Sequence, residues 1–226
     1  MNDLILLHGA MGSSDSLEDL KQVLSTSFNC HSFNFGGHGK EAFNKEGFGI
    51  EYFANELKEF IEVKHLNKPH IFGYSMGGYV ALYLASQEPN SLGKIVTLGT
   101  KFGWSPEAAE KETSRMNPDV MEEKIPAYTQ KLEQVHGQQW KELVWQTGAM
   151  MIELGEAPLL NIDSLNKVGN RTLVMRGSED QMVDDVESKW AVAHLPKGQF
   201  KLLEGQPHPI EKLDLQLLSE SLIHFL

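Results

Sequence analysis

Short apolar runs alternate with longer stretches of helical periodicity along most of the chain, and this rhythm limits the fold more than any other feature. The longer stretches carry apolar residues three and four positions apart, as at Ile50, Phe53 and Leu57, which is typical of helices packed on one side. Alternation of this kind indicates a parallel sheet with crossover helices. We therefore predict an α/β fold with a mostly parallel sheet flanked by helices. The six expected strands are residues 4–7, 28–35, 70–72, 94–98, 172–175 and 199–203.

The rhythm is interrupted in the middle of the chain. Between residues 102 and 160 no convincing strand occurs, and turn signals near Asn117-Pro118 and at Gly137 separate the helical runs. Roughly 60 residues of helix would hardly fold alone, because so short a segment buries too little apolar surface. We therefore expect residues 1–101 and 169–226 to form one core, with residues 102–168 inserted as a helical lid before the last two strands.

Charge and cysteine content exclude several classes of protein. The formal net charge of −11 argues against nucleic acid or an anionic membrane surface as a partner, because phosphates are bound by clustered Lys and Arg. Cys30 is the only cysteine, so an intramolecular disulfide is impossible. The N-terminal residues carry no basic leader, and no stretch approaches the length of a membrane span. We expect a cytoplasmic monomer or homodimer that holds no metal and binds a small-molecule substrate.

The expected strand at 70–72 runs directly into Gly73-Tyr74-Ser75-Met76-Gly77, which matches the pattern G-x-S-x-G. So tight a turn forces the serine into strained backbone geometry, and the glycines let strand and following helix approach without a Cβ clash. The turn lifts the hydroxyl into solvent at the carboxyl end of the sheet. An ordinary glycine-rich helix start is the alternative. The apolar strand before the motif and the amphipathic helix after it favour Ser75 as a nucleophile.

A serine hydroxyl needs a neighbouring base, and in this architecture an acid and then a histidine follow the serine along the chain. His208 lies between two prolines in the loop after the last expected strand. The other downstream histidines fall in the lid or in helices: His136, His194 and His224. We therefore predict His208 as the base, with a surface histidine in a turn as the alternative.

The acid should follow the strand at 172–175. Asp180 is three residues past Gly177, and Glu179 is its nearest rival. An acid at this place would hold the histidine in its reactive tautomer and stabilise the imidazolium. We predict Ser75, His208 and Asp180 as the catalytic residues.

The negative oxygen of an acyl-transfer intermediate needs two hydrogen-bond donors. One is expected to be the backbone N–H of Met76, at the start of the helix after the nucleophile. The other should come from the loop His8-Gly9-Ala10-Met11-Gly12 after the first strand. We predict the N–H groups of Ala10 and Met76 as an oxyanion hole. His8 precedes the serine and is expected to fix the loop by hydrogen bonds.

Together these motifs resemble the α/β-hydrolase superfamily, in the branch with a helical cap. Two departures are visible: the first two strands of the full fold have no counterpart before residue 4, and Asn34 stands where relatives often carry Asp. The resemblance implies a cofactor-free hydrolase, with small carboxylesterases as the default activity. It rests on Leu-Leu-His-Gly at 6–9, Phe-Gly-Gly-His-Gly at 35–39, Gly-Tyr-Ser-Met-Gly-Gly at 73–78, Arg-Gly-Ser-Glu-Asp at 176–180 and Pro-His-Pro at 207–209.

The expected function is cleavage of small to medium, mainly apolar carboxylic esters or thioesters through an acyl-enzyme. Arg115 is the only arginine of the insertion, which weighs against phosphorylated or dicarboxylate substrates. A C–C bond hydrolase, a lyase of the menaquinone-pathway type, and a triad-bearing receptor or stress-signalling protein remain as alternatives on the same fold. The residues expected to bind substrate, each of which could equally pack as core, are Met11, Tyr74, Trp104, Trp145 and Met150.

Overall fold

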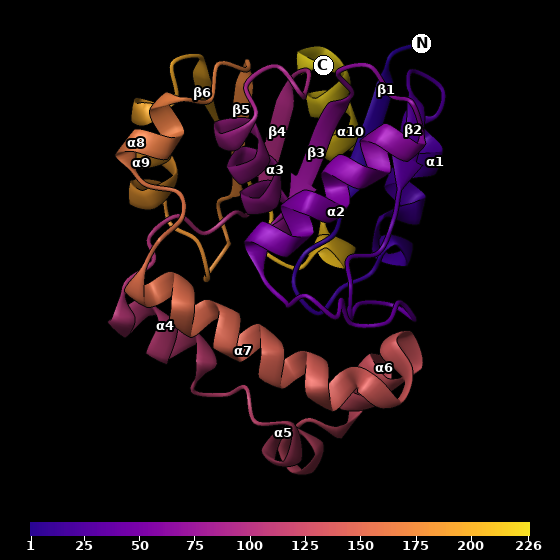
Figure 1. Ribbon diagram of the computed structural model, residues 1–226, viewed down its shortest axis with the longest axis vertical. Helices are drawn as coiled ribbons and strands as arrows, with labels where there is room; N and C mark the ends of the chain where they lie inside the picture. Colours follow the sequence, from indigo (N-terminus) through magenta and orange to yellow (C-terminus); the bar gives the residue numbers. More distant parts are fainter.

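A six-stranded sheet forms the centre of the molecule (Figure 1), and the computed structural model describes all residues 1–226. The strands stand in the order β2-β1-β3-β4-β5-β6. Every neighbouring pair is parallel, which confirms the predicted α/β architecture. Parallel neighbours need a crossover connection, and helices supply it. The strands are β1 (Asp3–Leu7), β2 (Asn29–Ser32), β3 (His70–Tyr74), β4 (Ile95–Leu98), β5 (Thr172–Gly177) and β6 (Gly198–Leu203).

Helices cover both faces of the sheet, and each face has its own apolar core. Side chains alternate along a strand, so Leu4 and Leu6 of β1 join one core while Ile5 and Leu7 join the other. All four are fully buried, as expected for a strand covered on both faces. The covering helices are α1 (Glu18–Leu24) and α10 (Leu215–Phe225) on the first face, and α2 (Ile50–Val63), α3 (Met76–Gln87) and α9 (Asp185–His194) on the second.

Four helices between β4 and β5 form a separate layer across the carboxyl edge of the sheet, the cap layer (Figure 1). Proline opens three of them, at a position where its missing N–H would have no partner in the helix anyway. Gly155 lets the first and last helices of this layer approach, because a Cβ there would lie 2.6 Å from Ala109 Cβ. No helix of the protein is both long enough and apolar enough to span a membrane. The cap layer consists of α4 (Pro106–Thr113), α5 (Pro118–Lys124), α6 (Pro126–His136) and α7 (Trp140–Glu156).

Some elements differ from those expected. β2 is shorter than the predicted 28–35, because this edge strand pairs with β1 over four residues only. The run after Pro209 reads in sequence as one closing helix from Ile210, but a short 3-10 turn at 210–212 comes first, and α10 begins after Asp214, whose side chain accepts the Leu217 N–H. A further helix, α8 (Ile162–Asn166), lies within the expected lid segment but packs against α3 and α9.

The strand order reverses between β1 and β3. From β1 the chain moves outward to β2, whereas from β3 it moves the other way to β4, β5 and β6. The helices that follow these two strands, α1 and α3, therefore lie on opposite faces. Open α/β sheets bind ligands in the crevice that forms at such a reversal. The loop after β1, residues 8–12, and Ser75 after β3 flank this point.

Candidate active site

Ser75 occupies the turn between β3 and α3 in a backbone conformation that is rare for a residue with a side chain. Its φ of 51° and ψ of −116° require the surrounding structure to hold it in place. Two hydrogen bonds to the segment at the end of β4 do so. The Ser75 N–H donates to Leu98 O at 2.8 Å, and the Thr100 hydroxyl donates to Ser75 O at 2.9 Å. The structure therefore places Ser75 on the predicted strand-to-helix turn.

Close packing explains the glycines on either side of this turn. A Cβ at Gly77 would lie 2.6 Å from Leu7 O of β1 and 2.8 Å from His8 O. A Cβ at Gly73 would lie 2.5 Å from Gly77 C in the first turn of α3. A side chain at either position would push α3 away from the sheet and move Ser75 with it.

His208 and Asp180 come together from the loops after β6 and β5. His208 Nδ1 lies 2.7 Å from Asp180 Oδ2, and the two side chains are 12% and 1% exposed. Asp180 Oδ1 accepts the N–H groups of Met182 (2.8 Å) and Val183 (3.0 Å). Burial alone would raise the pKa of the Asp180 carboxyl, but the hydrogen bond and charge of His208 and the two N–H groups bring that pKa below its ordinary value. The rival Glu179 is exposed to solvent.

Two further contacts hold His208 against the carboxyl ends of β3 and β4. The Tyr74 hydroxyl donates to His208 O at 3.1 Å, and Tyr74 directly precedes Ser75. A Cβ at Gly99 would lie 3.1 Å from His208 Nδ1 and Cε1, so the ring rests over the end of β4. His208 is hydrogen-bonded to Asp180 and not to the Ser75 hydroxyl in this structure. In sites without substrate, contacts between base and nucleophile often tighten only when substrate binds.

The residues predicted to form the oxyanion hole lie on the same small cavity as Ser75. Met76 opens α3, and the N–H groups of the first helical turn have no partner within the helix. The turn around Ala10 is closed by a hydrogen bond from Gly12 N–H to Gly9 O at 3.1 Å. Ala10 after β1 and Met76 after β3, whose N–H groups are the candidate donors, thus line the cavity that contains Ser75.

His8 holds the loop that carries Ala10. Its Nδ1 donates to Gly9 O at 2.8 Å, and its Nε2 accepts the Phe35 N–H at 3.2 Å. Burial lowers the pKa of His8 to about 4, because a positive charge cannot be solvated there. His8 is therefore neutral at pH 7 and acts as a fixed bridge between two loops.

His136 is a residue of the site region that sequence reasoning missed. It lies on α6, donates from Nε2 to Met11 O (3.0 Å) and accepts the Gly39 N–H at Nδ1 (2.9 Å). It thereby joins the cap layer to the loop after β1. No local pattern could have found it, since the two positions are far apart in the chain. No group of three or more His, Cys, Asp or Glu side chains is arranged to hold a metal ion.

The cavity at Ser75, which we call the Ser75 chamber, has a volume of about 40 Å³. Two of the five residues predicted to bind substrate, Trp104 and Met150, line this chamber. Tyr74 packs against His208 instead, with ring centroids 5.5 Å apart, and Met11 packs against a small apolar cluster of the cap layer. The chamber is lined by Ala10, Ile50, Ser75, Met76, Tyr79, Lys101, Trp104, Met150, Met151 and Leu154.

The structure does not bring Trp145 to the Ser75 chamber. Its side chain is 49% exposed on α7, whereas that of Met150 on the same helix is 5% exposed. The five-residue spacing between them turns the helix by roughly 140°. Since α7 buries only one of its sides against the chamber, Met150 faces inward and Trp145 faces outward.

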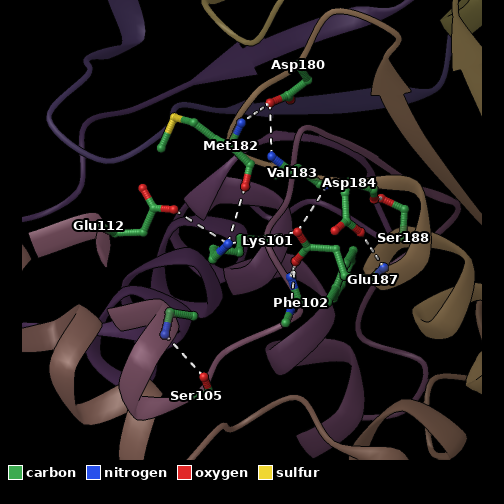
Figure 2. A network of polar contacts seen from close by, with 12 residues as sticks. Lys101, Phe102, Ser105, Glu112, Asp180, Met182, Val183, Asp184, Glu187 and Ser188 are labelled. Atoms are coloured by element: carbon green, nitrogen blue, oxygen red, sulfur yellow. Dashed lines mark hydrogen bonds and ion pairs between the residues drawn. The ribbon is translucent and has the colours of Figure 1, made fainter. Parts of the chain in front are cut away.

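Lys101, which follows β4, ties the cap layer to the loop after β5 (Figure 2). Its Nζ donates to Met182 O at 3.2 Å and lies 3.6 Å from Glu112 Oε1 and 3.9 Å from Glu187 Oε1. Glu187 Oε2 in turn accepts the N–H of Phe102 at 2.7 Å. The charge of Lys101 is therefore already shared between two carboxylates at the edge of the site.

Comparison with known proteins assigns a family to this geometry. A family model described as alpha/beta hydrolase fold matches residues 3–159, more than half of the chain. A pimeloyl-acyl-carrier-protein methyl ester esterase of Nitrosomonas europaea is 25% identical in an alignment that covers 91% of this chain and 87% of that protein. The chloroplastic protein PHYLLO of Arabidopsis thaliana is 31% identical over 105 residues, which span 42% of this chain and only 6% of PHYLLO.

A solved structure of a serine hydrolase from Cycloclasticus zankles is similar with a TM-score of 0.82 at 18% identity, covering 100% of this chain and 89% of that one. At this identity the likeness shows the fold. The match to the family model agrees with the parallel sheet and the serine turn, and the chain belongs to the α/β-hydrolase family.

Proposed function

We propose that this chain is a serine hydrolase that cleaves small to medium, mainly apolar carboxylic esters through an acyl-enzyme. Ser75 is the nucleophile, His208 the general base and acid, and Asp180 the residue that orients His208. The N–H groups of Ala10 and Met76 bind the oxyanion. The observation that carries the proposal is the Asp180–His208 pair at 2.7 Å, held over the end of β4, the strand whose last carbonyl, Leu98 O, accepts the N–H of the strained Ser75.

The reaction proceeds in two steps. Ser75 Oγ attacks the carbonyl carbon while His208 Nε2 takes the hydroxyl proton, and an electron pair moves onto the carbonyl oxygen. When that pair returns, the bond to the alcohol oxygen breaks, and His208 gives its proton to the departing oxygen. Water then attacks the acyl group on Ser75, again with His208 taking and returning a proton, and the carboxylic acid leaves.

Three features support the proposal. The lowered pKa of the Asp180 carboxyl keeps it ionised at neutral pH, so it can hold His208 Nδ1 protonated and stabilise the imidazolium. The lining of the Ser75 chamber is mostly apolar, which suits an acyl group without charge. The relative from Nitrosomonas europaea, similar over most of both chains, is named for the cleavage of an ester.

Rapid mixing with p-nitrophenyl acetate tests the proposal. An acyl-enzyme should give a burst of p-nitrophenolate equivalent to the enzyme, followed by a slower steady rate. Ser75→Ala should abolish the burst and lower kcat by about 10⁵-fold or more, as for other serine nucleophiles. Ser91→Ala is the matched control, because the Ser91 hydroxyl donates only to Glu88 O, in the turn that follows the end of α3. Identical rates in the wild type and in Ser75→Ala would overturn the proposal.

A further inference from the structure

The Ser75 chamber is small for a substrate site. Its volume of about 40 Å³ is about a quarter of the roughly 150 Å³ of an apolar protein cavity that holds benzene. A space of this size holds a methyl group next to a carbonyl, but it does not hold a chain of several methylenes.

The wall of the chamber toward α2 is part of the apolar core. Ile50, Met150 and Leu154 stand between the chamber and a second hollow of about 210 Å³ beside α2. Their side chains are 3–5% exposed. Met150 also packs on Gly49, where a Cβ would lie 3.8 Å from Met150 Cγ. A longer acyl chain could enter only if one of these three buried side chains left its place and gave up its packing contacts.

On its other side the chamber adjoins a larger hollow. Lys101 and Trp104 line both the chamber and this hollow of about 530 Å³. The His208 ring rests over Gly99, two residues before Lys101, and Lys101 lines both spaces. The departing alcohol takes its proton from His208, and the larger hollow is the neighbouring space that can hold it. The apolar part of the hollow consists of Phe102, Trp104, Leu160, Ile162, Val186 and Trp190.

We propose that the enzyme is selective for acetate esters of larger neutral alcohols, and that Met150 is the residue that limits the acyl group. The inference rests on the proposed function of Ser75 and names its substrate class. The acetyl group occupies the Ser75 chamber against Met150, and the alcohol extends past Trp104 into the larger hollow. Overall, ester and water yield acetate, a proton and the free alcohol, by the two steps described above.

The charges around the larger hollow favour a neutral alcohol. Asp184 and Glu187 line it, and Lys101 is its only cation. Lys101 lies within 4 Å of Glu112 as well as Glu187, so its charge is already balanced. A phosphorylated alcohol would meet net negative charge there, and like charges brought together at a binding surface are costly.

Two isomeric esters test this arrangement on the unmodified enzyme. Hexyl acetate and methyl heptanoate have the same composition, but the carbonyl lies near opposite ends of the chain. We expect kcat/KM for hexyl acetate to exceed that for methyl heptanoate by about 100-fold or more, because the heptanoyl chain cannot enter the chamber. Equal values, or a preference for methyl heptanoate, would overturn the proposal.

Shortening Met150 tests the wall itself. Met150→Ala should merge the chamber with the hollow beside α2 and raise the activity on p-nitrophenyl hexanoate, relative to p-nitrophenyl acetate, by about tenfold or more. Ile50→Ala opens the same wall from another helix and should act in the same direction. Met121→Ala is the matched control: the side chain is as buried as Met150 (5% exposed) but belongs to a separate cluster of the cap layer. It should leave the ratio unchanged.

The outcomes separate this inference from the proposed function. Suppose that p-nitrophenyl acetate gives a burst that depends on Ser75. The acyl limit alone would then be refuted if hexyl acetate and methyl heptanoate had similar kcat/KM. It would also be refuted if Met150→Ala and Ile50→Ala both left the hexanoate-to-acetate activity ratio unchanged. If no ester of either series were cleaved in a Ser75-dependent manner, the proposed function itself would be wrong.

Discussion

A cluster of three buried histidines and the partly exposed His208 both lie at the carboxyl edge of the sheet, and the partners of their rings differ. His8, His38 and His136 form a cluster on the β1 side, with ring centroids 4.9 Å apart for His8–His38 and 6.2 Å for His38–His136. Their hydrogen bonds go to backbone groups of the surrounding loops. His208, on the β5 side, pairs instead with the carboxylate of Asp180.

This difference decides what each ring can do. Burial lowers the pKa of all three cluster histidines, to about 4 for His8, because no neighbouring carboxylate compensates a buried positive charge. Their rings stay neutral and serve as fixed donors and acceptors. The ionised Asp180 can stabilise an imidazolium at His208. The carboxylate of Asp180 is thus the difference between the cluster histidines, which hold loops in place, and His208, which has a partner for a positive charge.

Replacing that carboxylate should have the largest effect. We expect Asp180→Asn to lower kcat by about 10⁴-fold, because the amide no longer holds His208 in the reactive tautomer. The control is Asp3→Asn, which removes the partner of His31 (3.0 Å) at the opposite end of β1. Steady-state rates on p-nitrophenyl acetate, with circular dichroism to check folding, distinguish the two. A similar loss of activity in both variants would contradict the special role of Asp180.

The cluster should act on stability with a pH dependence of its own. An unfolded histidine has a pKa of about 6.5, above the lowered values in the folded protein. Between pH 6.5 and 4 the unfolded chain therefore binds protons that the folded chain does not, and stability falls as the pH falls. At pH 5 the His8 ring alone should have lowered the free energy of unfolding by about 2 kcal/mol relative to pH 7.5. Urea unfolding at pH 7.5, 6 and 5 measures this loss.

A variant of the cluster sharpens this test. His38→Phe removes one titrating ring from a site already lined by aromatic rings, so the dependence of stability on pH should become weaker. His224→Asn changes an exposed histidine on α10 and should leave the dependence as in the wild type. Stability that did not change between pH 7.5 and 5 would show that the cluster is not held neutral.

The smallest effect is expected for the hydrogen bond from the Tyr74 hydroxyl to His208 O. Like the bonds of the histidine cluster, it involves a backbone group and no carboxylate. Tyr74→Phe removes the donor to His208 O, which should lower the unfolding free energy by about 1 kcal/mol. We expect kcat/KM to fall by less than about tenfold, because the Asp180 bond still orients the ring. Tyr83→Phe, which loses an exposed bond to Glu51, is the control. A loss comparable to that of Asp180→Asn would mean that the His208 backbone contact, and not the carboxylate, positions the base.

Several features of the fold and site were predictable because their causes are local. The turn at Ser75 brings Gly73 so close to the helix start that a Cβ there would lie 2.5 Å from Gly77 C, only four residues along the chain. The strands were recognisable as short apolar runs buried on both faces. Boundaries were less predictable: the apolar run at 28–35 continues past β2, but an edge strand ends where its single neighbour stops pairing with it.

The sequence by itself determined the alternation of strands and helices, the turn at Ser75, and the order in which Ser75, Asp180 and His208 follow one another. Only the tertiary structure decided which side of α7 faces the chamber, and so distinguished Met150 from Trp145. It also brought His136 to Met11 across 125 positions of the chain. The physical reason is that a helix's own pattern does not fix its rotation and placement relative to the sheet: these depend on the packing of the whole molecule.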